Sequence, residues 1–118
     1  MNDLLVIVGP TAVGKSAIAI ELAQRLDGEI VSADSRYLYR GMDIGTAKPT
    51  PADRARVPHH LIDVTDPDQP WSLAQFRDAA DVLIGEINRR GRLPILAGGA
   101  GQYIHALLEG WSIPRRAG

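Results

Sequence analysis

Residues 4–16 have the sequence LLVIVGPTAVGKS, and this stretch decides the fold. It opens with an uninterrupted apolar run from Leu4 to Val8, which is typical of a strand buried on both faces of a parallel sheet. Apolar residues then recur at helical spacing from Lys15 to Leu26, and Gly28 is expected to end this helix as a left-handed C-cap. The stretch therefore predicts a strand, a glycine loop and a helix.

The glycine loop matches G-x-x-x-x-G-K-[ST] in the strand-loop-helix context that this motif requires. Its backbone amides and the helix N-terminus can point at one phosphate, and the lysine adds a mobile positive charge. The serine hydroxyl is placed to bind Mg²⁺, which bridges to phosphate oxygens. The alternative is a glycine turn with an exposed lysine. The expected phosphate-binding residues are Gly9, Pro10, Thr11, Ala12, Val13, Gly14, Lys15 and Ser16, with Ser16 as the metal ligand.

Further strands and helices alternate along the chain. Ser72 and Gln75 form a capping-box pattern at the start of an amphipathic helix that Gly91 ends. Residues 36–58 are expected to form a long loop or short irregular helices. The other expected elements are strands at Glu29–Ala33, His60–Val64 and Leu93–Ala97 and a helix at Gln102–Glu109. This alternation predicts an α/β fold, a phosphate-loop NTPase-like parallel sheet flanked by helices, with ligands at the carboxyl ends of the strands.

The composition limits the number of domains, the kinds of partner and the kinds of metal site that the protein can have. The 118 residues suit a single domain. With 13 basic and 14 acidic side chains the net charge is -1, so any contact with nucleic acid must be local. Cysteine is absent, which excludes disulfides and thiolate metal sites. The longest apolar stretch is too short to span a bilayer and no cleavable leader is visible, so we expect a soluble cytoplasmic protein without membrane contact.

Three further stretches carry a family resemblance. Residues 34–49 have the sequence DSRYLYRGMDIGTAKP, residues 59–63 have HHLID, and residues 98–103 have GGAGQY. Together with the phosphate loop, and in this order, they resemble tRNA dimethylallyltransferases. The resemblance implies transfer of a dimethylallyl group from dimethylallyl diphosphate to N6 of the adenine next to the anticodon of tRNA. It also implies nucleotide (ATP) binding through the phosphate loop, a Mg²⁺ cofactor and a monomer at full length.

The resemblance also assigns roles to residues. Asp34 matches the family's general base, and a carboxylate that accepts a proton would help the weakly nucleophilic adenine amine. Lys15 and Thr11 match catalytic positions that contact the departing diphosphate. Asp34 and the residues after it match the segment that contacts tRNA; the expected tRNA-binding residues are Asp34, Ser35, Arg36, Tyr37 and Ala100. Asp34 as a helix N-cap or a ligand in the outer shell of magnesium is the alternative.

The chain departs from the family pattern at three places. Tyr37 stands where glutamine is common and Ala100 where threonine is common, which puts affinity for tRNA or preference for sequence context in question. Family members also continue well beyond the length of this chain. Residues 1–118 are therefore expected to be a truncated portion of the phosphate-loop catalytic domain, without the C-terminal part and the helical insertion that grips tRNA, and to prenylate tRNA poorly alone.

Several alternatives remain open at this point. His59 and His60 fit strand or surface positions better than a metal site, because no partner spacing accompanies them. Residues 98–101 form either a tight turn or a substrate contact through backbone amides. Arg89, Arg90 and Arg92 form either a basic edge or a solvated helix end. Rival functions are an adenylate isopentenyltransferase acting on free nucleotides, a small-molecule kinase and an inactive phosphate-binding remnant.

Overall fold

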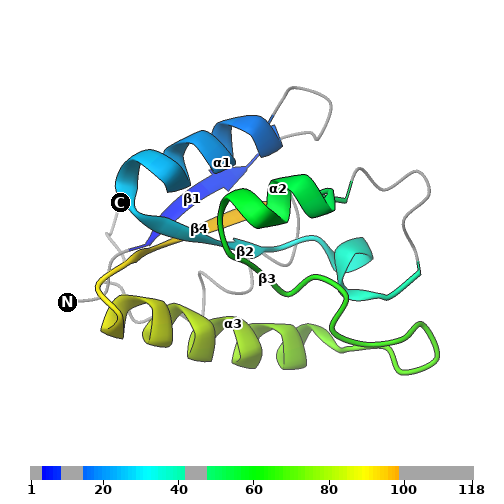
Figure 1. Cartoon of the computed structure of the whole chain (residues 1–118). Coiled ribbons are helices and arrows are strands. Elements are labelled where there is room, and N and C mark those ends of the chain that lie inside the picture. Colours follow the sequence, from blue (N-terminus) through cyan, green and yellow to red (C-terminus); the bar gives the residue numbers. More distant parts are fainter. Residues whose placement is uncertain (1–3, 9–14, 42–47, 99–118) are drawn as a thin grey trace.

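The computed structural model of the chain describes residues 4–8, 15–41 and 48–98, without the side chains of residues 8, 15, 16, 35 and 36. Within these ranges a four-stranded parallel sheet forms the centre, with strand order β1-β4-β2-β3. The strands are β1 (Leu5–Val8), β2 (Gly28–Ser32), β3 (His59–His60) and β4 (Leu93–Gly98). The expected α/β fold with a parallel sheet flanked by helices is confirmed (Figure 1).

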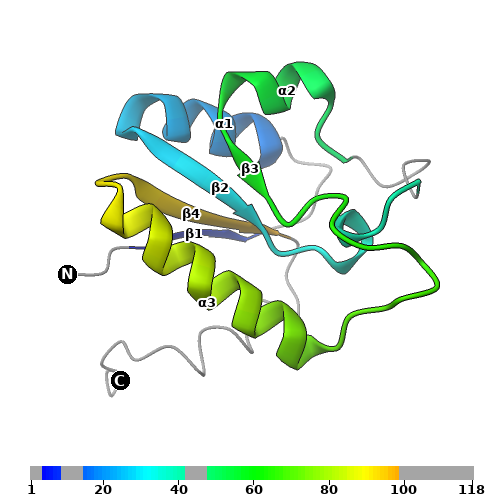
Figure 2. The same cartoon turned by 60° about the horizontal axis from the view of Figure 1, so that its bottom comes forward.

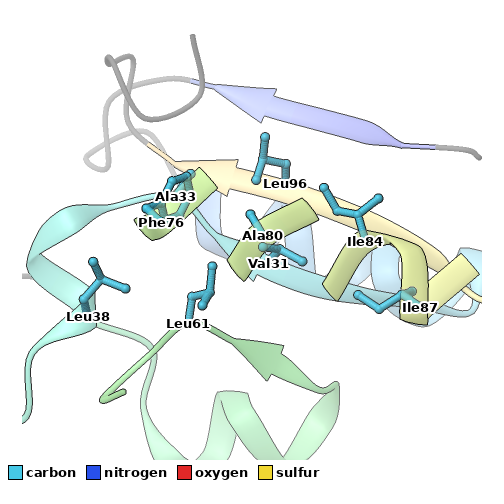
Figure 3. Packing of buried hydrophobic residues seen from close by; sticks show 9 residues of the cluster. All are labelled: Val31, Ala33, Leu38, Leu61, Phe76, Ala80, Ile84, Ile87 and Leu96. Atoms are coloured by element: carbon cyan, nitrogen blue, oxygen red, sulfur yellow. The ribbon is translucent and has the colours of Figure 1, made fainter. Parts of the chain in front are cut away.

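Helices cover both faces of this sheet. The helices α1 (Lys15–Leu26) and α2 (Pro51–Arg56) lie on one face, and α3 (Leu73–Arg89) lies on the other (Figures 1 and 2). Alternate residues of a strand point to opposite faces, and the core is divided accordingly. Ile30 and Ile95 pack with α1, whereas the next residues, Val31 and Leu96, pack with α3 (Figure 3). None of the described helices has the length and apolar character needed to cross a bilayer.

The helix α3 confirms the capping box that the sequence predicted. The Ser72 hydroxyl accepts a hydrogen bond from the Gln75 backbone N–H at 3.1 Å. In return, the Gln75 side-chain oxygen accepts one from the Ser72 N–H at 2.9 Å. Gly91 follows the helix with a positive φ of 77°, as expected for a residue that ends it. The expected C-terminal helix at residues 102–109 lies outside the described residues.

The prediction that Gly28 caps α1 is wrong. Asp27 is the left-handed residue, with φ of 58°, and Gly28 is the first residue of β2. A Cβ on Gly28 would lie 2.8 Å from the Leu93 carbonyl oxygen. Gly28 is therefore needed because the backbones of β2 and β4 approach closely there, and not because of its own φ.

Replacement of Gly28 by alanine is expected to reduce the free energy of unfolding by about 1–3 kcal/mol, because β4 must shift to admit the methyl group. Urea unfolding followed by circular dichroism measures this change. Gly85→Ala on α3 is the matched control, since the nearest atom to its added Cβ would be Arg89 Nη1 at 3.6 Å. Removal of a helical glycine should leave stability unchanged or raise it by about 0.5–1 kcal/mol. Equal losses for both variants would contradict the close-approach argument.

The predicted strand at His60–Val64 is wrong beyond its first residue. The strand β3 ends at His60, and Leu61 and Asp63 adopt left-handed φ values of 67° and 57° that break the extended backbone. The segment turns away from β2 and bonds to residues 37–38 instead. The Asp63 N–H donates to the Tyr37 carbonyl at 2.9 Å, and the Val64 N–H donates to the Leu38 carbonyl at 2.9 Å.

Of the two alternatives for residues 36–58, short helices are confirmed. A 3-10 turn spans Ser35–Leu38, and α2 spans Pro51–Arg56. The second helix has its own capping box, because Thr50 and Asp53 exchange side-chain and backbone hydrogen bonds at 3.1 Å each. Pro51 is the first helical residue, where its missing N–H costs nothing. The sequence signal for this helix is Thr50-Pro51 followed by Asp53, and it was not among the predicted caps.

Candidate active site

The candidate site lies at the carboxyl edge of the sheet. Val8, the last residue of β1, pairs with Gly98 at the end of β4. On the other side of β4, the Ala33 N–H donates to the Ala97 carbonyl at 2.8 Å. Asp34, the next residue, therefore lies at the same edge of the sheet as Val8 and Gly98. Two strand spacings, roughly 10 Å, separate the ends of β1 and β2. The helix α1 begins at this same edge (Figure 1).

Asp34 is partly exposed and immediately precedes the 3-10 turn. Its backbone carbonyl accepts a hydrogen bond from the Tyr37 N–H at 3.0 Å, which closes this turn. A carboxylate in this position can face a ligand at the edge of the sheet, and it can also act as an N-cap. Both roles from the sequence analysis therefore remain compatible with the position of Asp34.

Only part of the expected site falls on described residues. The loop residues Gly9, Pro10, Thr11, Ala12, Val13 and Gly14, and also Ala100, lie outside the described ranges. Lys15 and Ser16 are the first two residues of α1, and Ser35 and Arg36 are the first two of the 3-10 turn, but their side chains are not described. Tyr37 is only 4% exposed, so its ring would have to leave this position to stack on a base.

Comparison with known proteins identifies the family and supports the fold. The sequence model described as IPP transferase matches residues 37–117, more than half of the chain. The chain belongs to the IPP transferase family. A tRNA dimethylallyltransferase of a Roseiflexus species is 64% identical over 117 residues, which cover 99% of this chain and 38% of that protein. The enzyme of the same name from Chloroflexus aurantiacus is 62% identical over 117 residues, 99% of this chain and 40% of that protein.

Solved structures of this family have the same fold. The tRNA isopentenylpyrophosphate transferase of Bacillus halodurans superposes with a TM-score of 0.89 at 51% identity, over 98% of this chain and 38% of that one. A eukaryotic dimethylallyltransferase acting on tRNA gives a TM-score of 0.85 at 31% identity, over 98% of this chain and 31% of that one. This IPP transferase chain thus spans less than half the length of these relatives.

A buried lysine next to the site was not assigned a role from the sequence. The Lys48 Nζ donates to Asp63 Oδ1 at 2.7 Å and to the Tyr39 carbonyl at 3.0 Å. The other oxygen of Asp63 accepts a longer hydrogen bond from Arg54 at 3.4 Å. Lys48 lies in the stretch that carries the family resemblance, but no spacing rule links it to Asp63, 15 residues later.

At the opposite, amino-terminal edge, Glu29 forms a second polar cluster that the sequence analysis also missed. Its buried carboxylate accepts hydrogen bonds from His60 Nε2 at 2.7 Å and from Arg90. Arg92 Nε lies 3.0 Å from the other carboxylate oxygen but is not aligned for a hydrogen bond, so that contact is coulombic. Arg89 and Arg90 are exposed at the end of α3, as the alternative of a solvated helix end expected. In addition, Arg90 and Arg92 contact β2, through Glu29 and the Gly28 carbonyl.

The histidines occupy strand positions, as the sequence favoured. The two residues form β3, and His59 Nδ1 donates to the Val57 carbonyl at 2.9 Å. Burial lowers the pKa of His59 below its usual value, although that hydrogen bond acts in the opposite direction. No group of three His, Cys, Asp or Glu side chains suited to a metal occurs among the described residues.

Acid is expected to destabilise this chain through Glu29. Burial alone raises the pKa of this carboxyl, but the hydrogen bonds from His60 and Arg90 and the charge of Arg90 outweigh it, and the pKa is lowered. A lowered folded-state pKa contributes stability that is present above the unfolded value of about 4.5 and lost as pH falls through the folded value. Urea midpoints between pH 7 and pH 3 measure this loss.

Glu29→Gln should lower the free energy of unfolding at pH 7 by on the order of 2 kcal/mol and flatten its pH dependence. Glu21→Gln is the control, because the Glu21–Arg25 pair on α1 is exposed and contributes little. An unaltered pH dependence in Glu29→Gln would show that other carboxylates cause the loss of stability at low pH.

Proposed function

We propose that residues 1–118 form one portion of the catalytic domain of a tRNA dimethylallyltransferase. The reaction would move the dimethylallyl group from dimethylallyl diphosphate to N6 of the adenine next to the anticodon. One observation carries the proposal: Asp34 and the start of α1 lie at the same edge of a parallel sheet in a chain of the IPP transferase family. A phosphate-binding loop and a carboxylate at one edge can flank a single small substrate.

Each reacting centre would meet a suitable group of the chain. The allylic carbon would lose diphosphate as positive charge develops, and the departing anion would be stabilised by the Lys15 ammonium, the loop amides and the N-terminus of α1. Thr11 would contact the same diphosphate. The adenine amine would form the new C–N bond as Asp34 accepts one of its protons.

Magnesium fits the donor chemistry at this edge. Ser16 is the second residue of α1, where a hydroxyl oxygen could bind the ion together with diphosphate oxygens and water. When bound, the ion would neutralise part of the charge that develops on the diphosphate.

The nucleic-acid substrate would contact the segment after Asp34. A stacked adenine cannot reach a carboxylate at the edge of the sheet, so the base would have to leave its stack and enter the site. Ser35 and Arg36 would contact the RNA around it together with Ala100, and Tyr37 would do so only if its buried side chain left its position. This is a local contact, in keeping with the net charge of -1.

A chimera tests the proposal, because relatives are longer than this chain. Residues 1–118 would replace the matching part of the Roseiflexus enzyme, and transfer of labelled dimethylallyl would be measured with an anticodon stem-loop as acceptor. We expect transfer to a stem-loop with adenine next to the anticodon, and none when guanine replaces that adenine. Greater transfer to AMP would indicate an adenylate prenyltransferase, and phosphate transfer from ATP would indicate a kinase. Binding of diphosphate without any turnover would indicate an inactive remnant.

A further inference from the structure

We propose that Lys48 is a positioning residue that fixes the segment from Asp34 to Tyr39 for contact with tRNA. The inference rests on the proposed function, because it concerns the segment that would present the base and contact the RNA. Lys48 lies outside the phosphate loop and outside the segment itself. It would act through Asp63 and through the backbone of Tyr39, without touching either substrate.

The contacts of Lys48 join two separate pieces of chain. Its side chain is only 6% exposed, and its ammonium donates both to the Tyr39 carbonyl and to the Asp63 carboxylate. Tyr39 lies one residue beyond the 3-10 turn that starts after Asp34. The ammonium therefore ties the far end of this segment to the chain that leaves β3.

Asp63 is the second half of this link. Its backbone N–H donates to the Tyr37 carbonyl at 2.9 Å, and its carboxylate accepts from Lys48 at 2.7 Å. The neighbouring Thr65 continues the pairing, since its N–H donates to the Leu38 carbonyl at 3.1 Å and its own carbonyl accepts from the Arg40 N–H at 2.9 Å. Asp63 holds a left-handed φ of 57°, a conformation that needs support from its surroundings.

Tyr37 and Leu38 are buried, so packing holds the middle of the segment, but the Lys48–Asp63 ion pair itself borders open space. A cavity of about 620 Å³ adjoins the ion pair, lined by Lys48, Pro49, Thr50, Pro51, Arg54, Ala55 and Asp63. An apolar side chain of similar length could fill the place of Lys48 without removing an ammonium from water. The burial of this charge is therefore explained better by its two directed hydrogen bonds than by the volume that it occupies.

Asp34 is the first residue of the segment that Lys48 contacts at its far end. The sheet holds one end of the segment, through the Ala33 N–H bond to β4, and the Lys48–Asp63 pair holds the other end. With both ends fixed, the backbone from Asp34 to Tyr39 keeps one conformation before RNA binds. Loss of the Lys48–Asp63 contacts would leave the site for dimethylallyl diphosphate intact. It would only make the backbone from Asp34 to Tyr39 less ordered, so that the segment is less well positioned for RNA.

Lys48→Met, Asp63→Asn and the double variant, each in the chimera described above, test this inference. Lys48→Met should raise the KM for the anticodon stem-loop at least tenfold while the KM for dimethylallyl diphosphate changes less than twofold. Asp63→Asn, in which the amide tolerates the left-handed φ, should give a smaller rise. Asp66→Asn is the matched control: it removes an exposed ion pair with Arg40 beside the same segment and should leave both KM values unchanged.

The double variant separates positioning from simple stability. In Lys48→Met the Asp63 carboxylate keeps only its longer contact with Arg54 at 3.4 Å, whereas the double variant has no carboxylate at this position. The melting temperature of the double variant should therefore recover toward that of the unaltered protein, but the link to Tyr39 is still missing and the KM for RNA should remain raised. If the KM for RNA recovers together with the melting temperature, or if Lys48→Met affects both substrates equally, the inference is wrong.

Hydrogen exchange provides a readout that does not depend on turnover. In the 118-residue chain, Lys48→Met should increase amide exchange at residues 37–40 and 63–65 at least tenfold, while exchange in β2 and β4 is unchanged. Inactivity of the unaltered chimera on RNA would overturn the proposed function, and hydrogen exchange would still decide whether Lys48 orders the segment. Unchanged exchange at residues 37–40 would overturn the positioning role directly.

Discussion

Asp34→Asn is expected to lower kcat for prenyl transfer by a factor of about 10² to 10⁴, the range usually contributed by a positioned general base. The amide has nearly the same shape as the carboxylate but cannot accept a proton from the adenine amine. Binding of both substrates should change little, because the phosphate loop and the segment after residue 34 are unaltered. Single-turnover transfer to the stem-loop in the chimera, at saturating substrates and several pH values, measures the effect.

The same variant distinguishes the two roles that the structure leaves open for Asp34. Asparagine is as good an N-cap as aspartate, so Asp34→Asn preserves a capping role and removes only the base. Asp68→Asn, the same chemical change at an exposed turn residue, should have no effect. Retention of half the activity by Asp34→Asn would exclude a general-base role.

The parts of the fold that the sequence predicted are those with local signals. The apolar run at Leu4–Val8 became β1, and the Ser72–Gln75 pattern became a capping box at the start of α3. These signals depend on residues within a few positions of one another. Side-chain periodicity and capping chemistry act over this short range and need no knowledge of distant partners.

The errors arose where a distant segment determines the backbone. Leu61 and Ile62 are buried, as a strand would require, but the left-handed turn at Leu61 and Asp63 directs the chain to residues 37–38. Gly28 was expected to have a positive φ, whereas it is required by the carbonyl of Leu93, 65 positions along the chain. A sequence pattern records that a residue is buried or small, and it does not record which segment lies against it.

The candidate site likewise contains some features that the sequence predicted and others that only the structure revealed. Asp34 could be placed at the edge of the sheet because it directly follows the strand predicted at Glu29–Ala33, and β2 ends at Ser32, two residues before it. The partners of Glu29 lie 31 and 61 residues away, and those of Lys48 lie on two different segments. Because hydrogen bonds between side chains carry no periodic signal, these two clusters could be found only from the structure. Polar clusters of this kind hold strands and loops in place at both edges of the sheet.

Phe76→Ala is expected to reduce the free energy of unfolding by about 3–5 kcal/mol, a large part of the stability of a domain of this size. Phe76 is fully buried between α3 and the sheet, in the cluster that contains Ala33 and Leu38 (Figure 3). The truncation removes the ring from this cluster, and the surrounding strands and helix can collapse only partly into the space. Urea unfolding followed by circular dichroism measures the loss as a lower midpoint at an unchanged slope.

Val82→Ala on the same helix separates the loss of packing from the change in helix propensity, which alanine raises in both variants. Val82 is 58% exposed, so its truncation leaves no cavity and should change stability by less than about 0.5 kcal/mol. Because Ala33 precedes the 3-10 turn and Leu38 is its last residue, the cavity at Phe76 should also loosen the segment that begins at Asp34. Hydrogen exchange at residues 37–38 should then rise faster in Phe76→Ala than exchange at the start of β4. A uniform rise across the chain would mean that the cavity weakens the whole fold equally and has no particular connection to the site.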